Sequence, residues 1–185
     1  EVPEGYALSD TSPVACFNQL QRPSKPGTVG LPIAGCQVKV VDDQDRPLPS
    51  GERGEIVIRG SNVMKGYYKR PDETADALRG GWFHTGDIGV IDSDGYVAIV
   101  DRKKDMLIRG GMNVYPREIE DVLMTHPGVS PAAVIGVPDE RLGEEVKAFV
   151  VLKQGATLTP DELIGWSKEQ MAAFKYPRAV EIREG

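Results

Sequence analysis

The sequence predicts an α+β protein in which a small, mostly β unit is followed by a compact α+β domain. Three features support this prediction: strand-like apolar patterns recur between residues 36 and 100, amphipathic helix patterns follow only after residue 115, and a charged cluster separates the two regions. We therefore expect two domains, which cover residues 1–101 and 102–185.

The first unit is expected to contain short strands after an irregular beginning. Residues 1–27 are rich in Pro, Ser and Gln, and we expect them to be mostly irregular and ordered only against a partner surface. Residues 36–41 alternate as a strand does, and residues 56–58 are β-branched. Two further strands, 87–91 and 96–100, are joined by the turn sequence Asp-Ser-Asp-Gly, which predicts a hairpin.

The second unit is expected to begin with a hairpin and to follow the order β-β-α-β-β-α-β. Residues 106–109 and 113–115 flank Gly110-Gly111, a sequence typical of a tight turn. Pro116 suits the first position of a helix, and Pro127-Gly128 ends that helix.

The second helix of this unit carries an N-terminal capping signal. Thr159 can cap the helix, and Glu162 completes a capping box. We expect its apolar side to extend through Met171 and Phe174 and the helix to end at Pro177. The remaining strands of the unit are expected at 132–137, 146–152 and 179–182.

The composition argues against several classes of function. Lys and Arg number 22 against 28 Asp and Glu, a formal net charge of −6, so no basic excess attracts nucleic acid or an anionic membrane. No apolar run approaches the roughly 20 residues that span a bilayer, and residues 1–5 do not resemble a signal peptide. Cys16 and Cys36 could form one disulfide, but nothing in the sequence is typical of a secreted protein, so we expect both to stay reduced in a cytoplasmic protein. Because the chain starts without Met and runs directly into a motif, we expect a portion of a longer protein.

A polar segment near the start has the chemistry to contact a nucleotide. Residues 5–13 combine Tyr6 with several hydroxyl groups and the carboxylate of Asp10. An aromatic ring can stack on a base, and the hydroxyls and carboxylate suit phosphate and Mg²⁺. The alternative is a solvated polar loop, which composition alone favours.

Two further motifs lie at the ends of expected strands. Asp87 stands at the entry to a strand, where a carboxylate can accept both hydroxyls of a ribose; the alternative is a turn aspartate. His84 is interpreted as structural, and no His or Cys spacing indicates a metal site. Arg102 can reach a nucleotide oxygen, and its charged cluster falls where the folding pattern changes, which favours a hinge over a plain linker.

In this order and spacing the motifs resemble the adenylate-forming superfamily of acyl-CoA synthetases, luciferases and adenylation domains. The family pattern Gly-Tyr-Gly-x-Thr-Glu corresponds to residues 5–10, and its Thr-Gly-Asp string corresponds to residues 85–87. The resemblance covers essentially the whole chain. It implies that residues 28–101 form the β-barrel-like subdomain that ends a large N-terminal AMP-binding domain, and that residues 102–185 form a mobile C-terminal lid.

The resemblance also implies roles in nucleotide binding. Tyr6 would stack on adenine and Ser9 would contact phosphate. Asp10, one methylene shorter than the family's glutamate, would help to hold Mg²⁺. Asp87 would bind the ribose hydroxyls, and Arg102 would contact the nucleotide.

The implied reaction uses ATP, Mg²⁺ and CoA in two half-reactions. A carboxylic acid, for which a long-chain fatty acid is our expectation, would become an acyl-adenylate with release of pyrophosphate. The lid would then turn about Lys104, bringing the hairpin of Gly111 to the active site, and CoA would displace AMP. The family's phosphate loop and acyl pocket lie upstream, and its catalytic-lysine motif lies beyond Gly185. We therefore expect the chain alone to be inactive and to need the rest of the N-terminal domain.

Two other functions remain open. The chain could belong to an adenylation domain that loads a carrier protein instead of CoA, which a carrier domain downstream would indicate. It could also be a nucleotide-binding or protein-interaction module without turnover, which a reading frame starting near Glu1 and stopping after Gly185 would indicate.

Overall fold

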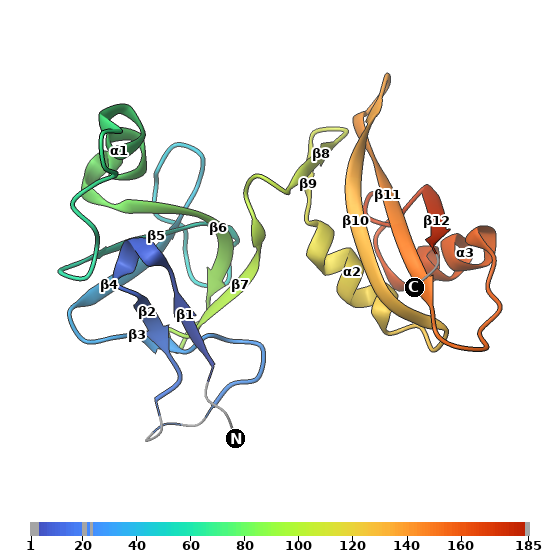
Figure 1. Ribbon diagram of the computed structural model, residues 1–185, viewed down its shortest axis with the longest axis horizontal. Helices are drawn as coiled ribbons and strands as arrows, with labels where there is room; N and C mark the ends of the chain where they lie inside the picture. Colours follow the sequence, from blue (N-terminus) through green and yellow to red (C-terminus); the bar gives the residue numbers. More distant parts are fainter. Residues whose placement is uncertain (1–3, 20–21, 23, 184–185) are drawn as a thin grey trace. The chain divides into compact units, whose positions relative to one another are not determined.

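The computed structural model describes residues 4–19, 22 and 24–183, which form two compact units (Figure 1). Unit 1 comprises Glu1–Lys103 and unit 2 comprises Lys104–Gly185. The division falls two residues beyond the boundary that the charged cluster suggested. Each unit has its own cluster of buried apolar side chains.

Unit 1 contains two antiparallel sheets. The first sheet consists of β1 (Gly5–Ala7), β2 (Val14–Phe17) and β3 (Leu31–Pro32). The second sheet consists, in chain order, of β4 (Cys36–Val41), β5 (Gly54–Gly60), β6 (Phe83–Ile91) and β7 (Val97–Arg102). These strands confirm the sequence prediction for 36–41, 56–58 and the hairpin joining 87–91 to 96–100.

Both sheets of unit 1 contribute to one core. Tyr6, Ala15 and Cys16 from the first sheet cluster with Ile58 and Phe83 from the second. The α+β class and the β-rich first unit are confirmed. The described strands form two open sheets that share this core, and neither closes into a barrel.

The expectation of a mostly irregular beginning is wrong for residues 5–17. β1 and β2 pair antiparallel, with Tyr6 opposite Cys16, and the short 3₁₀ helix η1 (Ser9–Thr11) connects them. The buried hydroxyl of Thr11 donates to the carbonyl of Pro13 at 2.6 Å and closes the turn. Strands this short carry little periodicity, and their order comes from packing against the second sheet. Residues 1–3, 20, 21 and 23 of this segment lie outside the described residues.

Unit 1 contains a short helix that the sequence analysis did not predict. α1 (Pro71–Ala77) begins with proline at its first position and acidic residues in its first turn, a combination that favours a helix start. Arg70 pairs with Glu73 at 2.7 Å along it. The helix packs against β6, and the partly buried Leu78 that follows it contacts the core.

Unit 2 places two helices on one face of a sheet. The strands are β8 (Leu107–Arg109), β9 (Met112–Val114), β10 (Val129–Asp139), β11 (Gly143–Leu152) and β12 (Ala179–Arg183). The helices are α2 (Pro116–Met124) and α3 (Pro160–Gln170). β11 pairs antiparallel with β10 and parallel with β12. The predicted order β-β-α-β-β-α-β is confirmed.

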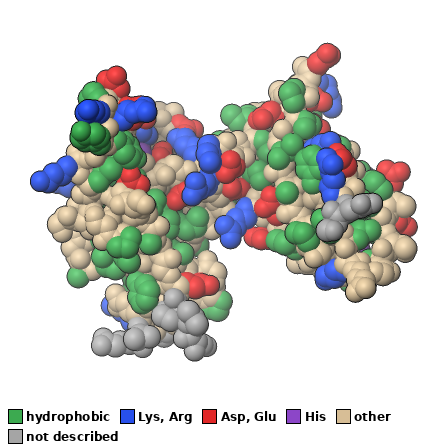
Figure 2. Space-filling view, viewed as in Figure 1, with side chains coloured by type: hydrophobic (Ala, Val, Ile, Leu, Met, Phe, Trp, Pro, Cys, Tyr) green, Lys and Arg blue, Asp and Glu red, His purple; other side chains and the backbone are tan. Residues whose placement is uncertain are grey.

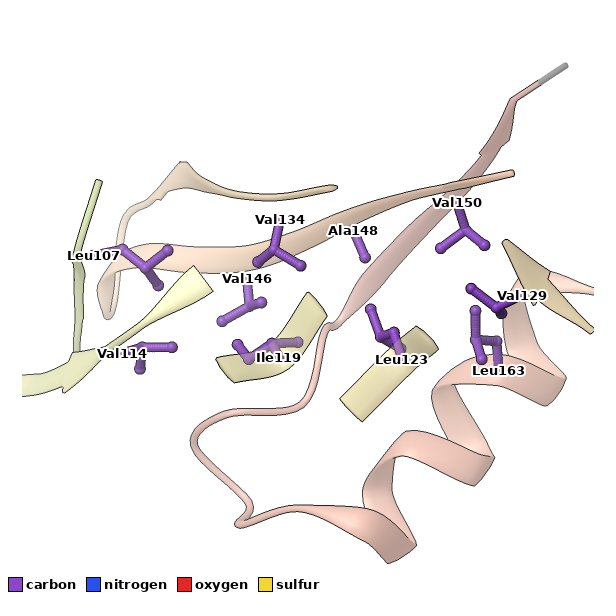
Figure 3. Close-up of a cluster of buried hydrophobic side chains, with 10 residues drawn as sticks. All are labelled: Leu107, Val114, Ile119, Leu123, Val129, Val134, Val146, Ala148, Val150 and Leu163. Atoms are coloured by element: carbon purple, nitrogen blue, oxygen red, sulfur yellow. The ribbon is translucent and has the colours of Figure 1, made fainter. Parts of the chain in front are cut away.

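The core of unit 2 lies between this sheet and its helices (Figure 3). Alternate residues of β11, Val146, Ala148 and Val150, point to one face, because successive strand side chains point to opposite faces. Ile119 and Leu123 of α2 meet them at helical spacing. Burying these side chains removes apolar surface from water, the dominant favourable contribution to folding.

The second helix of unit 2 confirms its predicted start and corrects its predicted end. Thr159 and Glu162 form the capping box, with the Thr159 hydroxyl accepting from the Glu162 amide at 3.3 Å. The helix ends at Gln170, before Met171 and Phe174, because Met171 adopts an extended backbone. Both side chains still pack against the core, from the loop that follows the helix. The apolar side chains of Met171 and Phe174 therefore reflect packing of the following loop on the core, and not a continuation of the helix.

The surface of the described residues carries both charge signs. On the face drawn in Figure 2, acidic and basic side chains are interspersed over both units. No described helix is long and apolar enough to cross a membrane.

A nearly buried ion pair fastens the first hairpin of unit 2 to its main sheet. Arg109 of β8 donates from Nε and Nη2 to the two carboxylate oxygens of Glu145 in β11, at 2.5 and 2.8 Å. Burial alone would raise the pKa of Glu145. The Arg109 guanidinium and the Val146 amide outweigh burial and hold that pKa below its ordinary value. A bidentate pair of this kind fixes orientation as well as distance.

We predict that Glu145→Gln in the full-length protein lowers the free energy of local unfolding at β8 and β11 by about 2 kcal/mol, because it leaves Arg109 without its charged partner. Hydrogen exchange of those amides above pH 5 measures this. Since the folded-state pKa lies below the ordinary value, the wild-type contribution is complete above about pH 4.5 and is lost as the pH falls through the folded-state pKa. The variant should lack this part of the pH dependence.

The matched control is Glu181→Gln in β12, whose partners Lys147 and Arg183 lie 2.9 and 2.6 Å away in more exposed pairs. We expect a change below about 0.5 kcal/mol there. Equal losses in the two variants would contradict the role assigned to the Arg109–Glu145 pair.

Candidate functional site

The site of unit 1 is built on a bulge in β6. Glu55 of β5 pairs with Ile88, and Val57 pairs with His84, so three residues of β6 (85–87) stand opposite the single residue Ile56. Gly86, in the middle of the bulge, has φ of +70°, a conformation that side-chain-bearing residues rarely adopt. A bulge of this kind re-aims the side chain that follows it, here that of Asp87.

Hydrogen bonds hold the bulged residues in place. The Thr85 hydroxyl donates to the carbonyl of Ile56 at 2.8 Å and accepts from the amide of Asp87 at 3.0 Å. The Gly86 amide donates to Oε1 of Glu55 at 3.2 Å, and its carbonyl accepts from the Lys103 amide at 2.7 Å. Side chains therefore replace part of the backbone pairing that the bulge interrupts.

The carboxylate of Asp87 joins the two sheets of unit 1 through a hydrogen bond. The Tyr6 hydroxyl in β1 donates a short hydrogen bond to Oδ2 of Asp87, and both residues are 8% exposed. Burial, and then the hydrogen bond to this carboxylate, hold the pKa of Tyr6 far above its ordinary value of 10.0. The phenol therefore stays protonated and remains a donor to the carboxylate.

Arg102 flanks the other oxygen of the same carboxylate. It stands directly opposite Asp87 in the β6–β7 ladder, and its Nε lies 3.6 Å from Oδ1 of Asp87. The Arg102 side chain is 64% exposed, so it can reorient toward a ligand. An aromatic ring, a carboxylate and an accessible guanidinium thus converge, although they come from β1, β6 and β7.

Ser9 and Asp10 lie beside this cluster in the chain but are not joined to it by a described hydrogen bond. Both belong to η1, which begins two residues after β1. Ser9 is exposed and Asp10 is partly buried. Burial and the hydrogen bond to Asp10 raise the pKa of Tyr67. Among the described residues no group of three His, Cys, Asp or Glu could hold a metal, so Mg²⁺ at Asp10 would need phosphate and water oxygens as its other ligands.

No sequence pattern predicts the buried carboxylate of Glu55, which is 5% exposed. Its Oε2 lies 3.1 Å from Nζ of Lys103 and 3.5 Å from both Nη2 of Arg79 and Nδ1 of His84. Burial alone would raise the pKa of Glu55, but the Lys103 ammonium, the Gly86 amide and His84 lower it overall. His84 is buried beside this carboxylate, which agrees with its structural interpretation.

The junction between the units lies one residue beyond this network. Lys103 is bound through its amide and its ammonium to unit 1, whereas Lys104 is exposed in a turn. In unit 2, Gly110 and Gly111 form the tip of the β8–β9 hairpin with φ of +58° and +81°. Gly111 is exposed, and a Cβ added there would meet no atom within 4 Å. The hairpin predicted at these glycines is confirmed.

Comparisons with known proteins match both units. The family model described as AMP-binding enzyme matches residues 1–68, and the one described as AMP-binding enzyme C-terminal domain matches residues 118–185. A long-chain-fatty-acid–CoA ligase of Escherichia coli O6:H1 is 45% identical over 181 residues, which cover 98% of this chain and 32% of the ligase. A feruloyl-CoA synthase of Amycolatopsis sp. is 45% identical over 182 residues, covering 98% of this chain and 37% of the synthase. The chain therefore spans about a third of the length of these curated relatives.

Solved structures give the same result. ATP-bound MatB from Rhodopseudomonas palustris matches with a TM-score of 0.94 and 41% identity, covering 98% of this chain and 36% of MatB. Apo MatB from the same organism has the same identity and coverage but a TM-score of 0.73. The two MatB structures therefore differ from each other over this region.

We predict that Asp87→Asn moves the pKa of Tyr6 toward 10.0, because it removes the negative charge beside the phenol. The pKa should stay above 10.0, since burial is the larger cause of the shift. Phenolate absorbance during alkaline titration measures this, and Tyr6→Phe identifies the transition that belongs to Tyr6. An unchanged Tyr6 transition in Asp87→Asn would contradict the assigned hydrogen bond.

Proposed function

This chain belongs to the AMP-binding enzyme family, and we propose that it is the C-terminal portion of an ATP-dependent, AMP-forming ligase that activates a carboxylic acid and transfers the acyl group to CoA. The observation that carries this proposal is the convergence of Tyr6 and Arg102 on the carboxylate of Asp87. The proposed acid is a long-chain fatty acid, on the analogy of the Escherichia coli relative's name. A cytoplasmic location fits the free, buried thiols of Cys16 and Cys36.

A single adenosine suits the arrangement at Asp87. The face of the Tyr6 ring would stack on adenine, while the neighbouring carboxylate would accept the two ribose hydroxyls. Base and ribose are joined in a nucleoside, and Tyr6 and Asp87 are in hydrogen-bond contact, so one ligand can satisfy both. Arg102, as a permanently charged donor, would turn from Asp87 to a nucleotide oxygen.

The phosphates would extend toward η1. The exposed hydroxyl of Ser9 would donate to a phosphate oxygen. The carboxylate of Asp10 would supply one oxygen ligand to Mg²⁺, which usually takes only one or two protein carboxylates and keeps phosphate and water oxygens. When bound, Mg²⁺ would supply charge neutralisation at the phosphates.

The chemistry needs no protein nucleophile. A carboxylate oxygen of the acid attacks the α-phosphorus of ATP, and the bond to pyrophosphate breaks. The CoA thiolate then attacks the acyl carbonyl, and AMP leaves. The residues of this chain would contribute by holding the nucleotide in position and by stabilising charge.

We extend the proposal to the domains. Residues 1–101 would end the large AMP-binding domain, and residues 102–185 would form a lid that swings about Lys104 and presents Gly111 in the thioester-forming state. Support comes from the end of unit 1 at the anchored Lys103 and from the difference between the two MatB structures. The open space at Gly111 suits close approach to a thin ligand.

The test is ATP–pyrophosphate exchange by the full-length protein with acids of increasing chain length, followed by thioester formation with CoA. Exchange with long-chain acids and formation of acyl-CoA support the proposal. Exchange with acyl transfer only to a carrier protein would favour an adenylation domain instead. Absence of exchange with every acid would favour a non-catalytic module.

We predict different effects for two changes at Tyr6. In the full-length protein, Tyr6→Phe should raise KM for ATP about fivefold, because the ring remains while Asp87 loses a donor. Tyr6→Ala should raise it about 50-fold or more, because stacking is lost as well. Initial rates of pyrophosphate exchange measure both. Equal effects of the two variants would show that the ring does not stack on the base.

We predict that Lys104→Pro slows thioester formation at least tenfold more than adenylation, because proline fixes φ and restricts rotation at the junction. Single-turnover measurements of pyrophosphate release and of CoA-dependent AMP release separate the two steps. Lys104→Ala, which keeps backbone freedom, should preserve the balance between the half-reactions. Equal losses in both half-reactions of Lys104→Pro would remove Lys104 from the hinge role.

A further inference from the structure

We propose that Glu55 is a positioning residue for nucleotide binding, which sets Asp87 through Gly86 and holds the end of unit 1 through Lys103. The inference rests on the proposed function and adds a residue that lies outside the motifs of the nucleotide site. Glu55 touches neither Tyr6 nor Arg102 in the described contacts, so its effect must pass through Gly86 of the bulge and through Lys103.

The first step of the argument is the gap that the bulge leaves. Because residues 85–87 face only Ile56, β5 cannot pair with all their backbone groups. Oε1 of Glu55 accepts the Gly86 amide at 3.2 Å. A buried amide without a partner would be costly, so this carboxylate oxygen stabilises the orientation of the peptide that precedes Gly86. The next residue along the chain is Asp87.

The second step is a closed ring of three contacts. Oε1 of Glu55 accepts from the Gly86 amide, the Gly86 carbonyl accepts from the Lys103 amide at 2.7 Å, and the Lys103 ammonium lies 3.1 Å from Oε2 of Glu55. The two oxygens of one side chain thus bind the loop that presents Asp87 and the strand end that follows Arg102. Burial strengthens such a network and restricts its alternatives.

The third step separates this role from simple charge neutralisation. Lys103 has a second carboxylate partner, Asp43, also at 3.1 Å, but that side chain is 71% exposed. Asp43 makes no described contact with Gly86. If Glu55 served only to neutralise Lys103, Asp43 would already supply much of that charge. Glu55 differs from Asp43 in its neighbours Arg79 and His84 at 3.5 Å and, for the position of Asp87, in its reach to the Gly86 amide.

Two conservative variants of the full-length enzyme separate the effect of side-chain length at position 55 from the effect of side-chain charge. Glu55→Gln keeps an oxygen at the same distance along the side chain but loses the charge. Glu55→Asp keeps the charge but is one methylene shorter, and a contact that already measures 3.2 Å would be lost. The matched control is Asp43→Asn, which removes a carboxylate from the same ammonium without touching the bulge.

We expect Glu55→Asp to raise KM for ATP about tenfold, the factor that corresponds to one hydrogen bond to a charged group. Glu55→Gln should raise it less than about threefold, and Asp43→Asn should leave it unchanged. The kcat of adenylation should stay within about threefold in each variant, because Glu55 contacts no reacting atom. Without ATP, hydrogen exchange at the Gly86 amide should accelerate in Glu55→Asp more than in Glu55→Gln.

The opposite order overturns the proposal: a larger KM for ATP in Glu55→Gln than in Glu55→Asp would mean that charge alone matters. An active wild type with a KM unchanged by either substitution also overturns it, while leaving the proposed function intact. A wild type without pyrophosphate exchange overturns the proposed function itself. In that case the Gly86 exchange rates, which require no nucleotide, still decide whether Glu55 holds the bulge.

Discussion

Three residues of β6 must fit opposite one residue of β5, and the candidate site follows from this constraint. The bulge turns Asp87 out of the regular alternation, so that its carboxylate meets Tyr6 from the other sheet and Arg102 from the next strand. Gly86 makes the turn possible, since its φ of +70° strains any residue with a Cβ.

The polar groups at this centre are arranged before any ligand arrives. A buried carboxylate must be hydrogen-bonded, and Asp87 meets this requirement through the Tyr6 hydroxyl, while the Arg102 guanidinium lies 3.6 Å away as an ion-pair partner. The same requirement applies to the buried carboxylate of Glu55, which accepts hydrogen bonds from the Gly86 amide and the Lys103 ammonium. A nucleotide would thus encounter an oriented acceptor, and preorganisation of this kind reduces the cost of binding.

The two units are packed separately and are joined by a short segment of the chain. Each has its own core, and the last residue of unit 1 is bound firmly to that unit. Within unit 2 the Arg109–Glu145 pair gives the β8–β9 hairpin a fixed attachment to the main sheet. Hinges are a few residues at the ends of structural elements, and this supports our proposal that the lid turns about Lys104.

The sequence by itself determined those features whose causes lie within a few residues of each other. The strand 36–41, the turn at Gly110-Gly111 and the capping box of Thr159 all appear where local patterns indicated. The motif residues Tyr6 and Asp87 could be named, because their order along the chain resembles a family pattern.

Only the tertiary structure decided how those residues meet. Tyr6 and Asp87 are 81 positions apart, and Glu55 and Gly86 are 31 apart. Their contacts depend on strand register and on the bulge, which neither composition nor periodicity specifies. For the same reason β1 and β2 were missed, and the helix ending at Gln170 was extended too far: their order comes from the surfaces on which they pack, and those surfaces exist only after folding.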